Sequence, residues 1–275
     1  MTTHPITRRT FLGTAAALAA PAVLPGSVLG CDRRPSEESL RVVDSSLMHY
    51  SGCSLNELKG SETVVLPHQA FLGYEKALAL RHGDSCIISV PHMMPEIERS
   101  RLRAARPAEA FDPGFLAKAL LISPDRVEGP SWIGIADRAS FTPVQSDALL
   151  RSPERPALMN LLKECGDIDW WRSGLSGPRG PIFGLFLGTD LAAVSSYVMS
   201  GDRLATIAIL THPAHRGKGY GKAAAGAAVA GAIDKGLVVL WRAPESKKGA
   251  VAFGKALGFH HYASTRGIRL AEDTF

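Results

Sequence analysis

A short glycine-containing turn that leads directly into a long alanine-rich helix is the feature that most constrains this 275-residue chain. Residues 211–231 read THPAHRGKGYGKAAAGAAVAG, with glycines at 217, 219 and 221. The first turn of a helix has unpaired N–H groups and a partial positive charge, and glycine leaves them open to a ligand because it has no Cβ. Such a place favours an anion, most often a phosphate. Arg216, Lys218 and Lys222 add positive charge around it.

The elements around this turn predict a mostly antiparallel sheet. Three strand-like runs at 181–188, 191–201 and 204–213 are joined by GTD and SGDR, which are typical hairpin turns. A helix over 219–235 follows, with Gly236 at its end. A buried strand at 237–241, a helix over 245–258 that stops at Gly258, and one or two strands over 259–270 complete this half.

Two common phosphate-binding loops do not fit the turn. A P-loop requires a hydroxyl residue after its lysine and a glycine at the first position, but Ala223 follows Lys222 and Arg216 occupies the first position. A dinucleotide-binding turn requires a third glycine at 222 and a βαβ unit, whereas the preceding strand belongs to an antiparallel meander. The remaining pattern is R-x-x-G-x-G, formed by Arg216, Gly219 and Gly221.

This pattern resembles the acyl-CoA-binding motif of the GNAT superfamily of N-acetyltransferases. The strand LVVLWRAP and a helix ending in ALGF follow it in the family's order, so that the resemblance covers about 180–270 and extends back to about 150. It implies an α+β fold with a mixed, mostly antiparallel sheet flanked by helices, preceded here by a smaller α+β N-terminal domain. It also implies acetyl-CoA as the co-substrate. The sequence shows no zinc-ligand spacing, so that no metal site is expected.

The resemblance assigns cofactor contacts residue by residue. The backbone of the strand end would pair with the pantetheine arm, and the turn would surround the pyrophosphate with its N–H groups. The alternatives are a plain tight turn and a solvated arginine, and Tyr220 is expected to pack behind the turn. The residues concerned are Ile209, Leu210, Thr211, Arg216, Gly217, Lys218, Gly219, Tyr220, Gly221 and Lys222.

Two positions depart from the family pattern. Many members have an Asn early in the last helix, where this chain has Lys247, and a Tyr that protonates the leaving thiolate, where this chain has Gly254. Tyr262 or Tyr197 could replace that tyrosine, although a structural role is the expectation for each.

The catalytic residues stay unassigned at this level. The attacking amine must lose a proton to a carboxylate, a histidine or a chain of water molecules, and a backbone N–H of the third strand would polarise the thioester carbonyl. No spacing selects among four candidate bases, for which solvation or helix capping is the simpler expectation: Glu164, Asp167, Asp169 and His212.

The remaining segments divide the chain as follows. Residues 1–30 resemble a twin-arginine export signal, with Arg8–Arg9 before a weakly hydrophobic stretch, and Val28–Cys31 resemble a lipoprotein box that would leave Cys31 lipidated. A charged linker is expected over 31–45, a smaller domain over 46–145 and the acetyl-CoA-binding domain over 146–275. Helices are expected at 72–83, 93–105, 115–122 and 154–165, strands at 86–90 and 129–137, and a loop over 166–181.

Composition limits the partners. A net charge of +5 without basic runs favours an anionic ligand and gives no indication of nucleic acid. The four cysteines have no CxxC pair, so that a disulfide framework is not expected. The oligomeric state is not predicted.

The sequence leaves two functions and two compartments open, together with a third reading in which an exported acyltransferase uses a donor other than acetyl-CoA. The first function is transfer of an acetyl group from acetyl-CoA to an amine of a small molecule or peptide. The alternative is a non-catalytic exported protein that binds an acyl-CoA-like ligand. The N-terminus indicates export, whereas acetyl-CoA is cytoplasmic.

Overall fold

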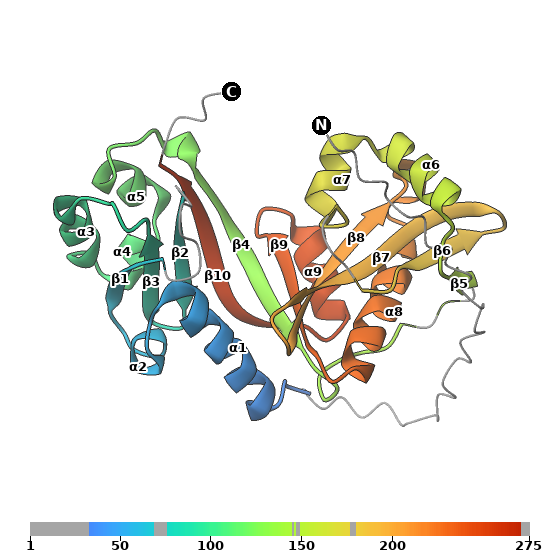
Figure 1. Ribbon diagram of the computed structural model, residues 1–275, viewed down its shortest axis with the longest axis horizontal. Coiled ribbons are helices and arrows are strands. Elements are labelled where there is room, and N and C mark those ends of the chain that lie inside the picture. Colours follow the sequence, from blue (N-terminus) through green and yellow to red (C-terminus); the bar gives the residue numbers. More distant parts are fainter. Residues whose placement is uncertain (1–32, 69–75, 145, 147–148, 177–179, 271–275) are drawn as a thin grey trace, which may run out of the picture. The chain divides into compact units, whose positions relative to one another are not determined.

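A ten-stranded mixed sheet forms the centre of the described chain, with strand order β1-β3-β2-β10-β4-β9-β8-β7-β6-β5 (Figure 1). The computed structural model describes residues 33–68, 76–144, 146, 149–176 and 180–270. The predicted export signal and Cys31 lie outside them. The strands are β1 Thr63–Pro67, β2 Lys76–His82, β3 Ser85–Val90, β4 Val127–Ala136, β5 Leu149–Arg151, β6 Phe183–Leu187, β7 Asp190–Ser200, β8 Leu204–Thr211, β9 Val238–Pro244 and β10 His260–Arg269.

Among the described strands, only the pairs β1–β3 and β8–β9 are parallel. The predicted α+β class with a mostly antiparallel sheet is therefore confirmed. The helices that flank the sheet are α1 Glu37–Ser51, α2 Leu55–Leu58, α3 Glu96–Arg103, α4 Pro107–Ala110, α5 Pro113–Ala119, α6 Arg155–Cys165, α7 Asp167–Ser173, α8 Tyr220–Asp234 and α9 Lys248–Ala256. In the described part of the chain no helix has the length and apolar character needed to cross a membrane.

The predicted meander is confirmed, with β6, β7 and β8 paired antiparallel in chain order. Helix α8 packs against all three strands. Its alanines make this close contact feasible: Ala224, Ala225, Ala228 and Ala232 are fully buried. Gly236 has the left-handed φ of 75° expected after the helix.

The first half of the chain joins the same sheet. Strand β4 pairs with β9, and the last strand, β10, lies between β4 and β2. Strands from both sides of residue 146 therefore lie side by side in one sheet. The domain boundary expected near that residue remains a prediction.

The helix predicted over 72–83 is wrong, because residues 76–82 form strand β2. Alanine and leucine favour helices, but this segment forms a hairpin with β3 through Gly83, which has a φ of 56°. Ala77, Ala79 and Leu80 are buried in the sheet. Tertiary pairing therefore overrides the helix propensity of the segment.

Two other expectations are corrected at charged segments. The linker expected over 31–45 contains α1 from Glu37 onward, and the loop expected over 166–181 contains α7. Both helices have two acidic residues in their first turn, where a negative charge stabilises the positive end of a helix. The predicted strands at 86–90 and 129–137 and helices at 93–105, 115–122 and 154–165 are confirmed within a few residues.

The carboxylate of Asp137 holds the start of α1 against the end of β4. Its Oδ2 accepts hydrogen bonds of 2.8 Å from the N–H and hydroxyl of Ser36 and from the hydroxyl of Ser39. Its Oδ1 accepts from the N–H groups of Ala139 and Ser140 at 2.9 and 3.0 Å. Burial by itself would raise the pKa of Asp137, but these hydrogen bonds outweigh it and leave the pKa below its ordinary value.

We expect Asp137→Asn to lower the free energy of unfolding at pH 7 by about 2 kcal/mol, because an amide replaces a charged acceptor. A carboxyl with a lowered pKa stabilises the fold above its unfolded-state pKa, and this stabilisation is lost as the pH falls through the folded-state value. The difference from the wild type should thus shrink below about pH 4. Urea unfolding at pH 7 and pH 3 measures it, with the exposed Asp234→Asn as control. A difference that is equal at both pH values would contradict this role.

We expect Gly258→Ala to lower the free energy of unfolding by about 3 kcal/mol or more. Gly258 has a φ of 88°, and a Cβ there would lie 2.0 Å from the carbonyl oxygen of Ser140. The control is Gly249→Ala within α9, where nothing lies within 4 Å of the added Cβ and where alanine should stabilise the helix by up to about 1 kcal/mol. Urea unfolding of both variants measures the two changes in the free energy of unfolding. Equal changes would contradict the steric contact at Gly258.

Candidate active site

Strands β8 and β9 part from each other halfway along their length. They pair in parallel at Leu204↔Val238, Ala205↔Val239 and Thr206↔Leu240. Beyond this point β8 continues to Thr211 along β7, and β9 continues to Pro244 along β4. The facing edges of the two strands therefore carry backbone groups that the sheet itself does not pair.

A cavity of about 650 Å³ lies at this opening. It brings together strand β8, the glycine turn, the start of α8, α7, β9 and α9. Its lining residues are Asp169, Arg172, Ser173, Ile209, Leu210, Thr211, His215, Arg216, Gly217, Gly219, Gly221, Lys222, Trp241, Lys247, Gly249, Ala250 and Phe253.

Eight of the ten residues that the sequence assigned to the cofactor line this one cavity. The exceptions are Lys218, which is exposed, and Tyr220, which is not part of the lining. The edge of the Tyr220 ring contacts His215, with the ring centres 5.9 Å apart, so that Tyr220 packs against the turn as expected.

The three glycines of the turn have different reasons to be glycine. Gly217 and Gly219 have left-handed φ values of 76° and 85°, and nothing lies within 4 Å of where their Cβ atoms would be. Gly219 is the N-cap of α8 and has no side chain to bond the first N–H groups. Gly221 instead allows close packing, because a Cβ there would lie 2.6 Å from the hydroxyl of Thr211.

Positive charge dominates the lining. The lining includes four cationic side chains and a single carboxylate, that of Asp169; the four are Arg172, Arg216, Lys222 and Lys247. Arg216 is held in place: its guanidinium donates to Asp169 at 2.7 Å and to the carbonyl oxygen of Thr211 at 3.2 Å. A cavity of this charge at a helix N-terminus suits a ligand with several negative charges.

An aromatic pair lies beside Gly254, the position at which the resemblance leads us to expect a tyrosine. A Cβ on Gly254 would lie 2.8 Å from Cδ1 of Trp241. The indole stacks on Phe253 with ring centres 4.8 Å apart, and its N–H donates to the carbonyl oxygen of Ala250 at 3.1 Å. Position 254 is glycine because Trp241 fills the space.

The structure places the two substitute tyrosines outside this cavity. The hydroxyl of Tyr262 donates to the buried carboxylate of Asp44, and burial raises the pKa of this tyrosine. Tyr197 is buried among core residues, and its hydroxyl has no partner among the described residues. Neither side chain lines the cavity.

The four candidate bases are dispersed. Asp169 lines the cavity but is paired with Arg216, and Asp167 lies in the first turn of α7. Glu164 and His212 line a second cavity, and Nδ1 of His212 accepts a hydrogen bond from the N–H of Ala214 at 3.2 Å.

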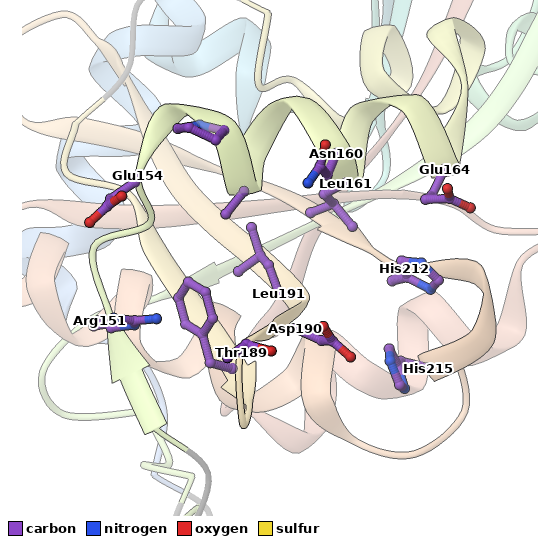
Figure 2. A pocket seen from close by; sticks show the side chains of 13 residues that line it. Arg151, Glu154, Asn160, Leu161, Glu164, Thr189, Asp190, Leu191, His212 and His215 are labelled. Carbon is purple, nitrogen blue, oxygen red and sulfur yellow. The ribbon is translucent and has the colours of Figure 1, made fainter.

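The second cavity has a volume of about 450 Å³ and lies between α6 and the turn that joins β6 to β7 (Figure 2). His215 lines both cavities, and sequence reasoning missed it. Its Nδ1 is buried without a partner among the described residues. In the described chain no three His, Cys, Asp or Glu side chains are grouped to hold a metal ion.

Comparison with known proteins agrees with this geometry. Residues 147–259 match the model of the acetyltransferase (GNAT) family. No curated protein matches the chain.

Several solved structures are similar to the chain at low identity. A GNAT-family chain from Novosphingobium aromaticivorans has 23% identity and a TM-score of 0.41; the match covers 51% of this chain and 63% of that one, less than two thirds of its length. A GCN5-related N-acetyltransferase-like protein from Streptococcus suis has 14% identity and a TM-score of 0.47, covering 84% and 98%. A chain from Salmonella typhimurium, solved with acetyl-CoA, has 15% identity and a TM-score of 0.34, covering 47% and 98%.

We expect Gly254→Ala to lower the free energy of unfolding by about 1–3 kcal/mol, because its methyl group overlaps the indole of Trp241. Trp241→Leu removes the overlap at the cost of a cavity. The double variant should then lose less stability than the sum of the two single variants. Urea unfolding of all four proteins completes the cycle, and strict additivity would show that the two residues do not compete for space.

Proposed function

We propose that the protein transfers an acetyl group from acetyl-CoA to an amine of an acceptor, because residues 147–259 match the model of the acetyltransferase (GNAT) family. The observation that carries this proposal is the cavity where β8 and β9 part, which extends to the glycine turn and is lined by four cationic side chains. The acceptor is a small molecule or a peptide.

The glycine turn would hold the pyrophosphate of the cofactor. Tyr220 and Gly221 are the first two residues of α8, so the helix has no carbonyl group four residues earlier to which their N–H groups could donate. Lys222 and Ala223 already donate to the carbonyl oxygen of Gly219 at 3.0 and 3.2 Å. The open space over Gly217 and Gly219 would allow phosphate oxygens to reach the free N–H groups.

The pantetheine arm would follow the free edge of β8. Its amides would pair with the backbone of Ile209 to Thr211, in place of the strand that β9 no longer provides. A backbone N–H of β8 would polarise the thioester carbonyl. Trp241 and Phe253 would line the thioester end of the arm, because Trp241 directly follows the last β8–β9 pair.

The amine would attack the thioester carbon directly, and the thiolate of CoA would leave and take up a proton. We propose that water takes the proton that the amine must lose and supplies the proton that the thiolate takes up. Trp241 blocks the family's tyrosine position, Tyr197 and Tyr262 lie outside the cavity, and Asp169 is paired with Arg216. Solvent can carry protons at the thioester end without any of these side chains.

A second candidate function is non-catalytic binding of an acyl-CoA-like ligand by an exported protein. The observation that favours it is that two positions depart from the pattern of the family. Gly254 stands at the tyrosine position and Lys247 at the asparagine position. Release of free thiol from acetyl-CoA across a panel of amines separates the two, because a binder releases none.

The compartment is a proposal of its own. Export with lipid attachment at Cys31 predicts a precursor cleaved before that residue, whereas a cytoplasmic enzyme predicts an uncleaved chain. Mass spectrometry of the N-terminus of the expressed protein distinguishes them.

We expect Gly219→Asp to weaken acetyl-CoA binding at least tenfold, because a carboxylate would occupy and repel the pyrophosphate. Calorimetric titration of the full chain measures this. The matched control is Gly201→Asp, a second exposed turn glycine with a left-handed φ, 68°, and open space around it, which should bind as the wild type does. A folded wild-type protein that fails to bind acetyl-CoA would overturn the proposed function.

A further inference from the structure

The cavity between α6 and the β6–β7 turn has an apolar floor under a charged rim (Figure 2). Leu161, Phe186 and Leu191 form the floor and are 2%, 3% and 7% exposed. Figure 2 shows Glu154 and Glu164 towards opposite ends of the cavity, along α6. They are ten positions apart, which corresponds to a rise of about 15 Å along a helix. This length and floor suit an elongated ligand with an apolar body.

The rim is acidic. Glu154, Glu164 and Asp190 have no ion-pair partner among the described residues. Arg151, the single Lys or Arg of the lining, lies over the ring of Phe186, with its guanidinium carbon 4.1 Å from the ring centre. Three carboxylates against one guanidinium leave this cavity negative, opposite in sign to the neighbouring one.

We propose that this second cavity binds an organic ammonium ion with an apolar body, and that its occupation strengthens acetyl-CoA binding next door. The ammonium group would bind the rim carboxylates at the end near His212, and the body would cover the leucines and Phe186. That acetyl-CoA is the ligand of the neighbouring cavity rests on the proposed function.

The second cavity would regulate acetyl-CoA binding and would not hold the acetyl acceptor, because it meets the first cavity at the proposed pyrophosphate end. The shared residue is His215, beside the glycine turn that would hold the pyrophosphate. Trp241, at the proposed thioester end, does not line the second cavity. An amine there would face the phosphates and not the acetyl group.

A wall of two histidines couples the two cavities. The ring of His215 lies 5.1 Å from that of His212 and 5.9 Å from that of Tyr220, the first residue of α8, between ring centres. Carboxylates on one side of this wall disfavour phosphates on the other side. An ammonium ion bound beside Glu164 and Asp190 offsets part of their negative charge and so reduces this penalty, and by reciprocity acetyl-CoA strengthens the binding of the ammonium ion.

Calorimetric titration of n-pentylammonium chloride into the full chain, at low salt, tests the site. We expect binding at one site, at least tenfold tighter than that of n-pentanol, which has the same body without the charge. Glu164→Gln and Asp190→Asn should each weaken it at least threefold. Glu62→Gln, an exposed carboxylate before β1, should leave it unchanged. Absence of binding, or equal binding of the alcohol, would overturn the proposal.

A second titration tests the coupling. With n-pentylammonium at saturation, the affinity for acetyl-CoA should rise about fivefold, and the double variant of Glu164 and Asp190 should lose this increase. An unchanged affinity refutes the coupling. Acetylation of pentylammonium, with only its KM raised in the variants, would make the cavity an acceptor site and refute the regulatory assignment. Failure of acetyl-CoA to bind at all would contradict the proposed function and the coupling, whereas the first titration alone decides the ammonium site.

Discussion

The parting of β8 and β9 after Thr206 and Leu240 is the constraint on which the candidate site depends. Each strand keeps its other neighbour, β7 or β4, so that the sheet stays continuous while an edge is exposed inside it. An exposed edge within a sheet offers unpaired backbone groups to an extended ligand. The glycine turn lies at the far end of β8, so the edge and the open helix start contribute to one cavity.

Packing of small residues keeps this opening in place. Helix α8 approaches the meander through alanines, and Gly221 brings its first turn against Thr211. On the other strand, Trp241 is held by Phe253, by the carbonyl oxygen of Ala250 and by the space that Gly254 leaves. The same contacts that shape the cavity therefore exclude a tyrosine from position 254. This is the physical reason for proposing that water carries the protons.

The two cavities differ in charge although they share His215. The lining of the larger one includes four Lys or Arg side chains and one carboxylate, and it opens on a helix N-terminus, whereas the lining of the smaller one includes three carboxylates and one guanidinium. Opposite potentials on the two sides of a thin wall allow an anionic and a cationic ligand to bind together and to stabilise each other. Sequence spacing gave no indication of this, because the carboxylates come from α6 and from the start of β7, which are distant in the chain.

Local signals in the sequence determined the meander, the helix after Gly219 and the strand–helix order that follows, because hairpin turns, glycines and apolar periods act over a few residues. The resemblance to the GNAT family added ten residues for the cofactor, of which eight line the larger cavity. Only the tertiary structure decided that residues 76–82 form a strand, since their pairing with β3 and β10 outweighs the helix propensity of Ala and Leu. It likewise decided that Trp241 packs against Gly254 and that His215 lines two cavities, because both depend on contacts between distant segments that no local pattern encodes.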